Sequence, residues 1–258
     1  MQFKYTSHQD IGRRQVNQDS VMTLEAETEK GPVLLMSVCD GMGGLSHGEI
    51  ASSAMIDALN EWFEKELPDI IYINRDEDMK TEIFSGFRTA AKRADRKIRE
   101  FSEQEGIRCG TTAVALLLIH RRYYIMNIGD SRAYLYRKHM YQLTKDQTQA
   151  QMMIDNFELS EKDACTHKAS SILLQCVGAG STLEPEFQSG TVMDNDIFLL
   201  CSDGFRHKVT KDEMELAIKE EDPKTHIELL NLISYLTEVN KRRGEQDNIS
   251  TTIVRAFT

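Results

Sequence analysis

Short apolar runs alternate with longer segments of helical periodicity along this chain. Runs rich in Val, Ile, Leu and Tyr are typical of strands. They predict strands at residues 20–26, 33–39, 112–119, 123–129, 132–137, 197–201 and 249–256. Several of these runs follow one another too closely for a crossover helix to fit between them, so the sheets are expected to be antiparallel.

Other segments carry the three-to-four-residue spacing of amphipathic helices. One apolar stripe covers residues 79–101 and a second covers about 46–66. Near the end of the chain, Thr210 and Thr225 each stand three residues before a glutamate, a pattern that caps the first turn of a helix. This order of elements predicts an α+β fold in which helices pack on the outer faces of antiparallel sheets.

The length of 258 residues is compatible with one domain, and no repeat, low-complexity tract or linker divides the chain. We therefore expect a single domain over residues 1–258. Residues 145–190 have the weakest pattern of all and are expected to form a flap.

The net charge and the hydropathy of the chain argue against nucleic acid and membranes as partners. A net charge of −10, with a pI near 5.3, would repel phosphate backbones, so nucleic acid is not an expected partner. No run approaches the roughly 20 apolar residues that cross a bilayer. The first residues lack the basic start and apolar core of a secretory signal. A cytoplasmic protein without membrane contact is the resulting expectation.

The cysteines do not form a recognisable ligand or disulfide pattern. They are odd in number, include no C-x-x-C pair and stand at Cys39, Cys109, Cys165, Cys176 and Cys201. Buried reduced thiols fit this pattern better than disulfides or a zinc site.

Aspartates recur where predicted strands begin or end: Asp19, Asp40, Asp130, Asp203 and Asp247. A single Asp-Gly pair is usually only a turn. If the sheets bring several carboxylates together, however, their repulsion requires a cation. Oxygen ligands without clustered His or Cys select Mg²⁺ or Mn²⁺ over zinc.

Glycines and an arginine accompany these acids. Gly41, Gly43 and Gly44 would let the backbone approach such a site closely, so that a carbonyl oxygen could also serve as a ligand. Arg14 stands five residues before Asp19, and a planar guanidinium there could bind a phosphate group beside the metal.

Taken in order, these segments resemble the motif series of the metal-dependent protein serine/threonine phosphatases, type 2C, of the compact bacterial type. The matching stretches span nearly the whole chain and lie at residues 14–20, 40–44, 109–113, 129–132, 143–146, 201–204 and 247–250. The resemblance implies a four-layer α-β-β-α sandwich, in which two central antiparallel sheets are flanked by helices. It also implies a metal centre at one edge of that sandwich.

The resemblance implies a metal-binding role for five residues. Asp40 would bridge two Mn²⁺ or Mg²⁺ ions, the Gly41 carbonyl would bind one of them, and Asp203 and Asp247 would bind the other. Asp130 together with Asp203 would hold a third, weaker ion.

Two further residues complete the expected catalytic set with Asp40. Asp19 would hold a metal-bound water, and Arg14 would bind the substrate phosphate. Met42 stands where animal members have a histidine proposed as general acid, so protonation of the leaving group is left to metal-bound water or to no group that the sequence identifies. Gln18 replaces a glutamate that many relatives have.

A third departure lies at the start of the expected flap. The triplet Asp146-Gln147-Thr148 stands in place of Asp-His-Ser, although His167 follows further along. This departure argues against a role for a flap histidine.

The implied activity is hydrolysis of phosphoserine and phosphothreonine in proteins by a water activated between the two ions. Phosphorylated proteins and a cognate Ser/Thr kinase are the expected partners, and the expected state is a monomer. A cysteine mechanism is excluded, because neither Cys109 nor Cys201 lies in a glycine- and arginine-rich anion loop.

Two alternatives remain open from the sequence. The enzyme could act on small phosphoesters or nucleotides instead of proteins. The chain could also be a catalytically silent binding module that has kept the fold. The presence of Asp40, Asp203 and Asp247 together argues against the silent module, since a decayed site is expected to lose at least one ligand.

Overall fold

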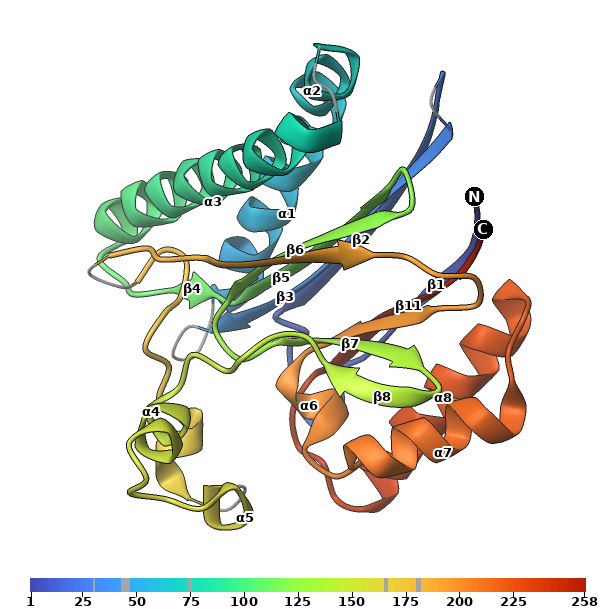
Figure 1. Cartoon of the computed structure of the whole chain (residues 1–258). Coiled ribbons are helices and arrows are strands. Elements are labelled where there is room, and N and C mark those ends of the chain that lie inside the picture. The colour runs from blue at the N-terminus through green and yellow to red at the C-terminus, as the bar shows by residue number, and fades with distance from the viewer. Residues whose placement is uncertain (30, 43–46, 74–75, 165–166, 180–181) are drawn as a thin grey trace.

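The computed structural model describes residues 1–29, 31–42, 47–73, 76–164, 167–179 and 182–258. Two β-sheets lie face to face in the centre, and helices cover both outer faces (Figure 1). Every pairing between the described strands is antiparallel. The predicted four-layer α-β-β-α sandwich is therefore confirmed.

The first sheet has the strand order β1-β11-β10-β7-β8. Its strands are β1 Gln2–Asp10, β7 Arg132–Arg137, β8 His139–Gln142, β10 Ile197–Cys201 and β11 Ile249–Phe257. The second sheet has the order β2-β3-β5-β6-β9, with β4 paired to β3. Its strands are β2 Asp19–Thr28, β3 Gly31–Met42, β4 Gly110–Thr111, β5 Ala113–Ile119, β6 Arg122–Ile128 and β9 Glu186–Thr191.

Two sets of helices form the outer layers. The second sheet is covered by α1 Gly48–Lys65, α2 Leu67–Ile73 and α3 Asp76–Glu105. The first sheet is covered by α6 Asp203–Arg206, α7 Lys211–Glu221 and α8 His226–Arg242. Both predicted capping boxes are confirmed, at the starts of α7 and α8. Within the described parts of the chain, every helix is too short or too polar to cross a membrane.

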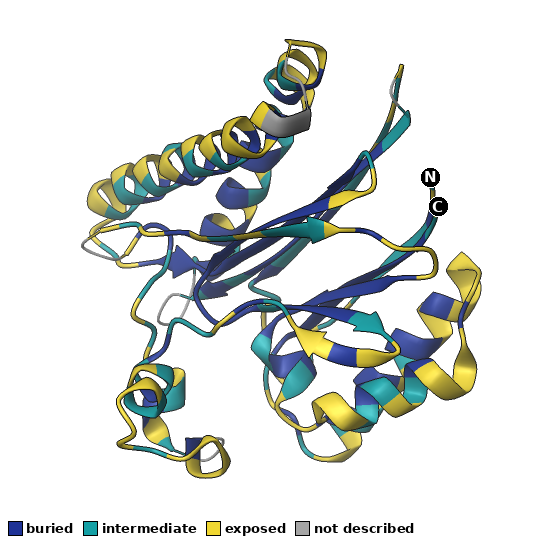
Figure 2. Cartoon of the chain, viewed as in Figure 1, coloured by how far each residue is buried: buried dark blue, intermediate teal, exposed yellow. Residues whose placement is uncertain are grey.

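Strand β3 explains why an unbroken apolar run forms a strand here. Leu34, Met36 and Val38 face the other sheet, whereas the alternating residues Val33 and Leu35 face the helices. A strand buried on both faces has no polar face to give an alternating pattern. Figure 2 shows the central strands as the most buried part of the chain.

The segment between β8 and β9 forms a small lobe that projects from the sandwich, at the lower left of Figure 1. It contains α4 Gln149–Asp155, α5 Glu161–Ala164 and the 3₁₀ turn η1 Lys168–Ser171. The lobe has a small apolar cluster of its own around Ala150 and Ala169. Residues 186–190, which the predicted flap includes, belong instead to β9 in the second sheet.

Candidate functional site

Asp19 and Asp40 lie directly opposite each other on the paired strands β2 and β3. Two carboxylates in this position repel each other. The backbone of Asp40 is fixed by Thr112, whose hydroxyl accepts the Asp40 N–H at 2.9 Å and whose N–H donates to the Asp40 carbonyl at 2.9 Å. The start of β2 and the end of β3 therefore hold two acids side by side.

Gly41, the next residue, lies where no side chain fits. A Cβ atom at this position would be 2.1 Å from the carbonyl oxygen of Gly48 and 2.4 Å from that of Gln18. The close approach of backbone that the sequence predicts is thus present at Gly41. Gly43 and Gly44, which carry the same expectation, lie outside the described residues. The role of the Gly41 carbonyl as a ligand stays a prediction.

Ser202 and Asp203 follow β10 of the first sheet and lie beside the acids of the second sheet. Asp203 begins α6 directly after β10, and the Ser202 hydroxyl donates to Asp19 Oδ2 at 2.9 Å. This hydrogen bond joins the ends of the two sheets. Burial raises the pKa of Asp19 to about 7, although hydrogen bonds from Ser250 and Ser202 oppose the rise.

The carboxyl groups influence one another strongly. Burial, followed by the charges of Asp19, Asp203, Asp130 and Asp247, raises the pKa of Asp40 well above its ordinary value. These acids come from both sheets, and the structure brings them together as the sequence predicts. The site therefore accumulates negative charge that a cation would relieve.

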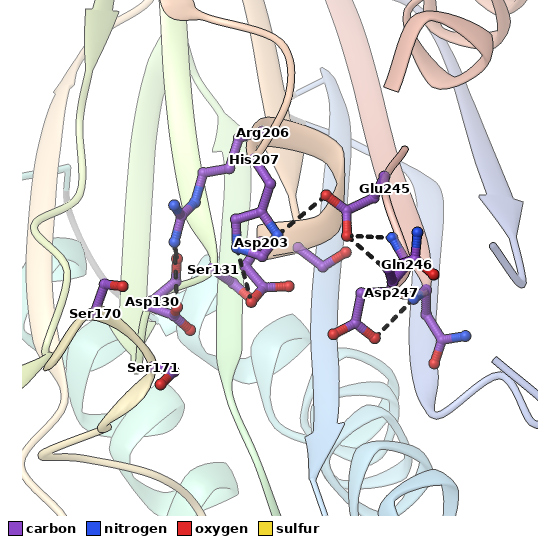
Figure 3. A network of polar contacts seen from close by, with 12 residues as sticks. Asp130, Ser131, Ser170, Ser171, Asp203, Arg206, His207, Glu245, Gln246 and Asp247 are labelled. Atoms are coloured by element: carbon purple, nitrogen blue, oxygen red, sulfur yellow. Dashed lines mark hydrogen bonds and ion pairs between the residues drawn. The ribbon is translucent and has the colours of Figure 1, made fainter. Parts of the chain in front are cut away.

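His207 is a site residue that the sequence did not reveal. Its ring lies between two carboxylates, with Nε2 3.2 Å from Asp203 Oδ2 and Nδ1 3.3 Å from Glu245 Oε2 (Figure 3). Burial lowers the pKa of His207, but these two acids outweigh burial and raise the pKa to about 10. The imidazole is therefore a cation at neutral pH. Its only sequence signal is a position four residues after Asp203.

His207 also affects the charge on Asp203. Burial raises the pKa of the Asp203 carboxyl. The hydrogen bond and charge of His207, the charge of Arg206 and a hydrogen bond with Asp40 outweigh burial and lower the pKa to about 2. Asp203 therefore stays ionised while Asp40 beside it tends to keep a proton.

Asp247 is paired with Arg14. The guanidinium donates from Nε to Asp247 Oδ1 at 2.9 Å and from Nη2 to Oδ2 at 2.7 Å. Asn248 positions the loop that carries Arg14, because its side chain accepts the Gln18 N–H at 2.9 Å and donates to the Val16 carbonyl at 3.1 Å. Arg14 thus reaches the site, as the sequence predicts.

Asp130 lies at the turn after β6, and its side chain contacts Arg206 (Figure 3). Burial raises the pKa of Asp130 to about 7, and the charge of Arg206 opposes that rise. Arg206 is a second residue that the sequence did not reveal. The predicted role of Asp130 as a ligand of a third ion stays untested by this contact alone.

The residues that depart from the family pattern have structural contacts. Gln147 accepts the N–H of Gly129 through Oε1 at 2.7 Å, and the Thr148 hydroxyl caps α4. His167 caps η1 by accepting the Ala169 N–H at Nδ1. Met42 ends β3 and carries no titratable group. None of these contacts provides a general acid.

The donor set of the site fits hard divalent ions. Its candidate ligands are all oxygens, and Asp203 Oδ1 is buried without a hydrogen-bond partner among the described residues. Within that same part of the chain, no three His, Cys, Asp or Glu side chains form a group that could hold a metal ion as they stand. Arg14 pairs with Asp247, and His207 pairs with Asp203. These two side chains would have to move away before the carboxylates could bind a metal ion.

Two of the buried thiols are poor nucleophiles. Cys39 and Cys201 are buried, and burial raises the pKa of each to about 12. Cys109 is also buried and unbridged, whereas Cys176 is partly exposed. Cys165 lies outside the described residues. A thiolate mechanism is therefore excluded for Cys39 and Cys201.

Comparison with known proteins gives consistent matches over nearly the whole chain. The family described as Protein phosphatase 2C matches residues 6–250. The serine/threonine phosphatase stp of Listeria monocytogenes is 31% identical over 251 residues, which are 95% of this chain and 92% of that protein. The serine/threonine protein phosphatase PstP of Mycobacterium tuberculosis is 28% identical over 257 residues, which are 97% of this chain and 44% of PstP.

Solved structures agree with this result. The Mycobacterium tuberculosis serine/threonine phosphatase PstP/Ppp superposes with a TM-score of 0.81 at 27% identity, and the match covers 99% of each chain. The catalytic domain of PstP in complex with 2 manganese ions gives a TM-score of 0.78 at 26% identity, again over 99% of each chain.

Proposed function

Since the chain belongs to the protein phosphatase 2C family and is a serine/threonine protein phosphatase, we propose that it hydrolyses phosphoserine and phosphothreonine with the help of two Mn²⁺ or Mg²⁺ ions. The observation that carries the proposal is the meeting of Asp19, Asp40, Asp203 and Asp247 at one edge of the two sheets. Their mutual repulsion leaves a demand for positive charge at that edge.

When bound, the two ions would supply an acidified water and would neutralise charge on the phosphoryl oxygens. Asp40 is proposed to contact both ions, because it lies among the other acids. The Gly41 carbonyl is proposed to bind one ion, and Asp203 and Asp247 the other. The manganese complex of PstP supports the choice of metal.

Asp19 and Arg14 are proposed to act on the water and on the phosphate, respectively. Asp19 lies beside Asp40 and is held by Ser202, so its carboxyl can accept a hydrogen bond from a water at the site. The Arg14 side chain is 57% exposed, and a guanidinium in this position can turn from Asp247 to a phosphate group.

Phosphorylated proteins are the proposed substrates, and the proposed biological role is to oppose a Ser/Thr kinase in the cytoplasm. The expectation of a monomer stays a prediction. The lobe of α4, α5 and η1 is proposed to contact the protein part of the substrate, because it projects beyond the sandwich.

The deciding experiment is hydrolysis of a phosphothreonine peptide after chelation, with and without added Mn²⁺. Rapid turnover of the peptide only with the metal supports the proposal. A nucleoside monophosphate and p-nitrophenyl phosphate serve as competing substrates. Activity confined to the nucleotide would reject protein substrates, and full activity in excess chelator would reject the metal mechanism.

A further inference from the structure

Arg206 is an arginine enclosed beside the proposed metal centre. Its side chain is only 13% exposed. One nitrogen, Nη2, lies 3.0 Å from the carbonyl oxygen and 3.2 Å from the Oδ2 of Asp130. The same nitrogen lies 3.4 Å from Asp146 Oδ2. A buried guanidinium persists only when carboxylates compensate its charge, and two do so here.

Asp146 is held from its other side by a second arginine. Arg132 donates to the two carboxylate oxygens of Asp146, from Nε at 2.7 Å and from Nη2 at 2.6 Å. Arg132, Asp146, Arg206 and Asp130 therefore form a chain of alternating charge. Each acid in this chain of charges contacts an arginine, and the formal charges of the two acids and the two arginines sum to zero.

The chain of charges is fixed to the proposed metal centre. Arg206 follows Asp203 by three residues on the short helix α6, so its side chain starts from the same turn as this proposed ligand. Asp130 is close enough to Asp203 for the charge of Asp203 to act on its carboxyl group. The guanidinium thus contacts the carboxylate of Asp130. This is the carboxylate that would bind a third ion together with Asp203.

A divalent ion at that position would face strong repulsion. It would have to approach the guanidinium closely in a buried setting, where charges are poorly screened. Its binding would also require Arg206 to move away from Asp130, and this movement would disturb the contact between Arg206 and Asp146. The residues around Asp130 therefore do not fit a third ion.

We propose that Arg206 takes the place of a third metal ion, so that this phosphatase binds two ions and neutralises Asp130 with its own side chain. The proposal rests on the two-ion function proposed above. It assigns Arg206 as a positioning residue that holds Asp130 beside the centre, not as a group that touches the substrate.

The test is the number of Mn²⁺ ions bound per chain, measured by electron paramagnetic resonance of free Mn²⁺ and by native mass spectrometry. Wild-type protein should bind two ions, and Asp130→Asn should also bind two. A wild-type count of three that falls to two in Asp130→Asn would overturn the proposal while leaving the two-ion function intact. No bound Mn²⁺ in any variant would overturn both.

Substitutions of Arg206 test the same idea from the other side. Arg206→Met frees Asp130 and should raise the count from two to three, with the third site lost again in the double variant Arg206→Met, Asp130→Asn. Arg206→Lys keeps a cation and should keep the count at two. Circular dichroism establishes folding first. A folded Arg206→Met protein that still binds two ions would contradict the proposal, and if that variant does not fold, the comparison of wild type with Asp130→Asn decides.

Discussion

The Asp247 carboxylate accepts two hydrogen bonds from the Arg14 guanidinium, at 2.9 and 2.7 Å. A residue proposed to bind metal and a residue proposed to bind phosphate are therefore direct partners. Because the Arg14 and Asp247 side chains are 57% and 30% exposed, such a pair stabilises the fold by only about 0–1 kcal/mol. The pair can open at little cost, which allows Asp247 to take a cation and Arg14 to take an anion.

Arg14→Ala should mainly weaken substrate binding. Loss of charge-assisted hydrogen bonds to phosphate costs about 1.5–3 kcal/mol, which lowers kcat/KM by roughly 10- to 150-fold. Most of this loss should appear as a higher KM for a phosphopeptide. Arg14→Lys keeps the charge but loses the bidentate geometry, so its kcat/KM should lie between those of wild type and Arg14→Ala. A change confined to the Mn²⁺ requirement would show that Arg14 serves Asp247 alone.

Asp40→Asn should abolish most activity without unfolding the protein. Substitution of groups that only orient metal ligands costs 10–100-fold, so loss of a shared ligand should lower kcat by at least about 100-fold. The chelated variant should melt no lower than wild type, since one of the two carboxyl groups that face each other on β2 and β3 is gone. Steady-state kinetics and thermal melts check both points.

Asp196→Asn is the matched control for Asp40→Asn. Asp196 is a buried acid paired with Arg137, on the loop before β10. Its substitution leaves a charged partner behind and should lower the thermal midpoint while kcat of the folded protein is kept. Near wild-type kcat in Asp40→Asn, or equal loss of kcat in both variants, would contradict the assignment of Asp40.

Metal removal should affect stability as well as activity. Ions that bind only the folded protein stabilise it by about 2.7 kcal/mol at one hundred times the dissociation constant. The thermal midpoint of chelated protein should therefore rise when Mn²⁺ is added, and it should rise far less in Asp40→Asn. An equal rise in both proteins would place the stabilising ions elsewhere.

The lobe can be removed at a natural boundary. Thr148 and Leu173 form a β-bridge at its base, and the Gln149 N–H donates to the Ile172 carbonyl at 2.9 Å. Replacement of residues 149–172 by a short Gly-containing turn should change the preference among phosphopeptides and leave hydrolysis of p-nitrophenyl phosphate largely intact. Equal loss on both kinds of substrate would make the lobe part of the catalytic core.

Glu213 should give the protein a distinct acid dependence. The hydrogen bond from Arg243, followed by the bond from the Thr210 N–H, lowers the pKa of Glu213 to about 2, below its ordinary 4.5. The stabilisation of the folded state by ionised Glu213 is therefore present above pH 4.5 and disappears as the pH falls toward 2. Glu213→Gln should lower the unfolding free energy at pH 7 by about 0.2–1 kcal/mol. Urea unfolding from pH 7 to pH 2.5 should show that difference shrink, and a constant difference would reject the ion pair as its cause.

The central strands were predictable from the sequence, and several edge strands were not. Strand β3 has apolar residues at nearly every position because both of its faces are covered. Strand β1, in contrast, is an edge strand whose sequence is mostly polar, and Phe3 is its only fully buried residue. Strand β9 is likewise a partly exposed edge strand. Such strands form because of the strands they pair with, and the local sequence pattern carries no information about those partners.

The acids of the site were predictable because they stand at strand ends, but the groups that hold them were not. His207 and Glu245 meet only after α6 and the loop before β11 pack together. Arg206 and Asp130 are 76 positions apart. Nothing in the local sequence of Asp130 indicates that a guanidinium lies against its carboxylate, so a metal role alone was expected.

Asp40 and Asp203 are attached to different sheets, and the apolar layer between those sheets sets how far apart they are. Leu116 on β5 and Phe198 on β10 both belong to that layer. Because protein interiors are close-packed, a change in its thickness cannot be absorbed locally and shifts one sheet against the other. The affinity of the proposed site for ions should therefore depend partly on side chains that contact no ligand, and substitutions in this layer should change that affinity from a distance.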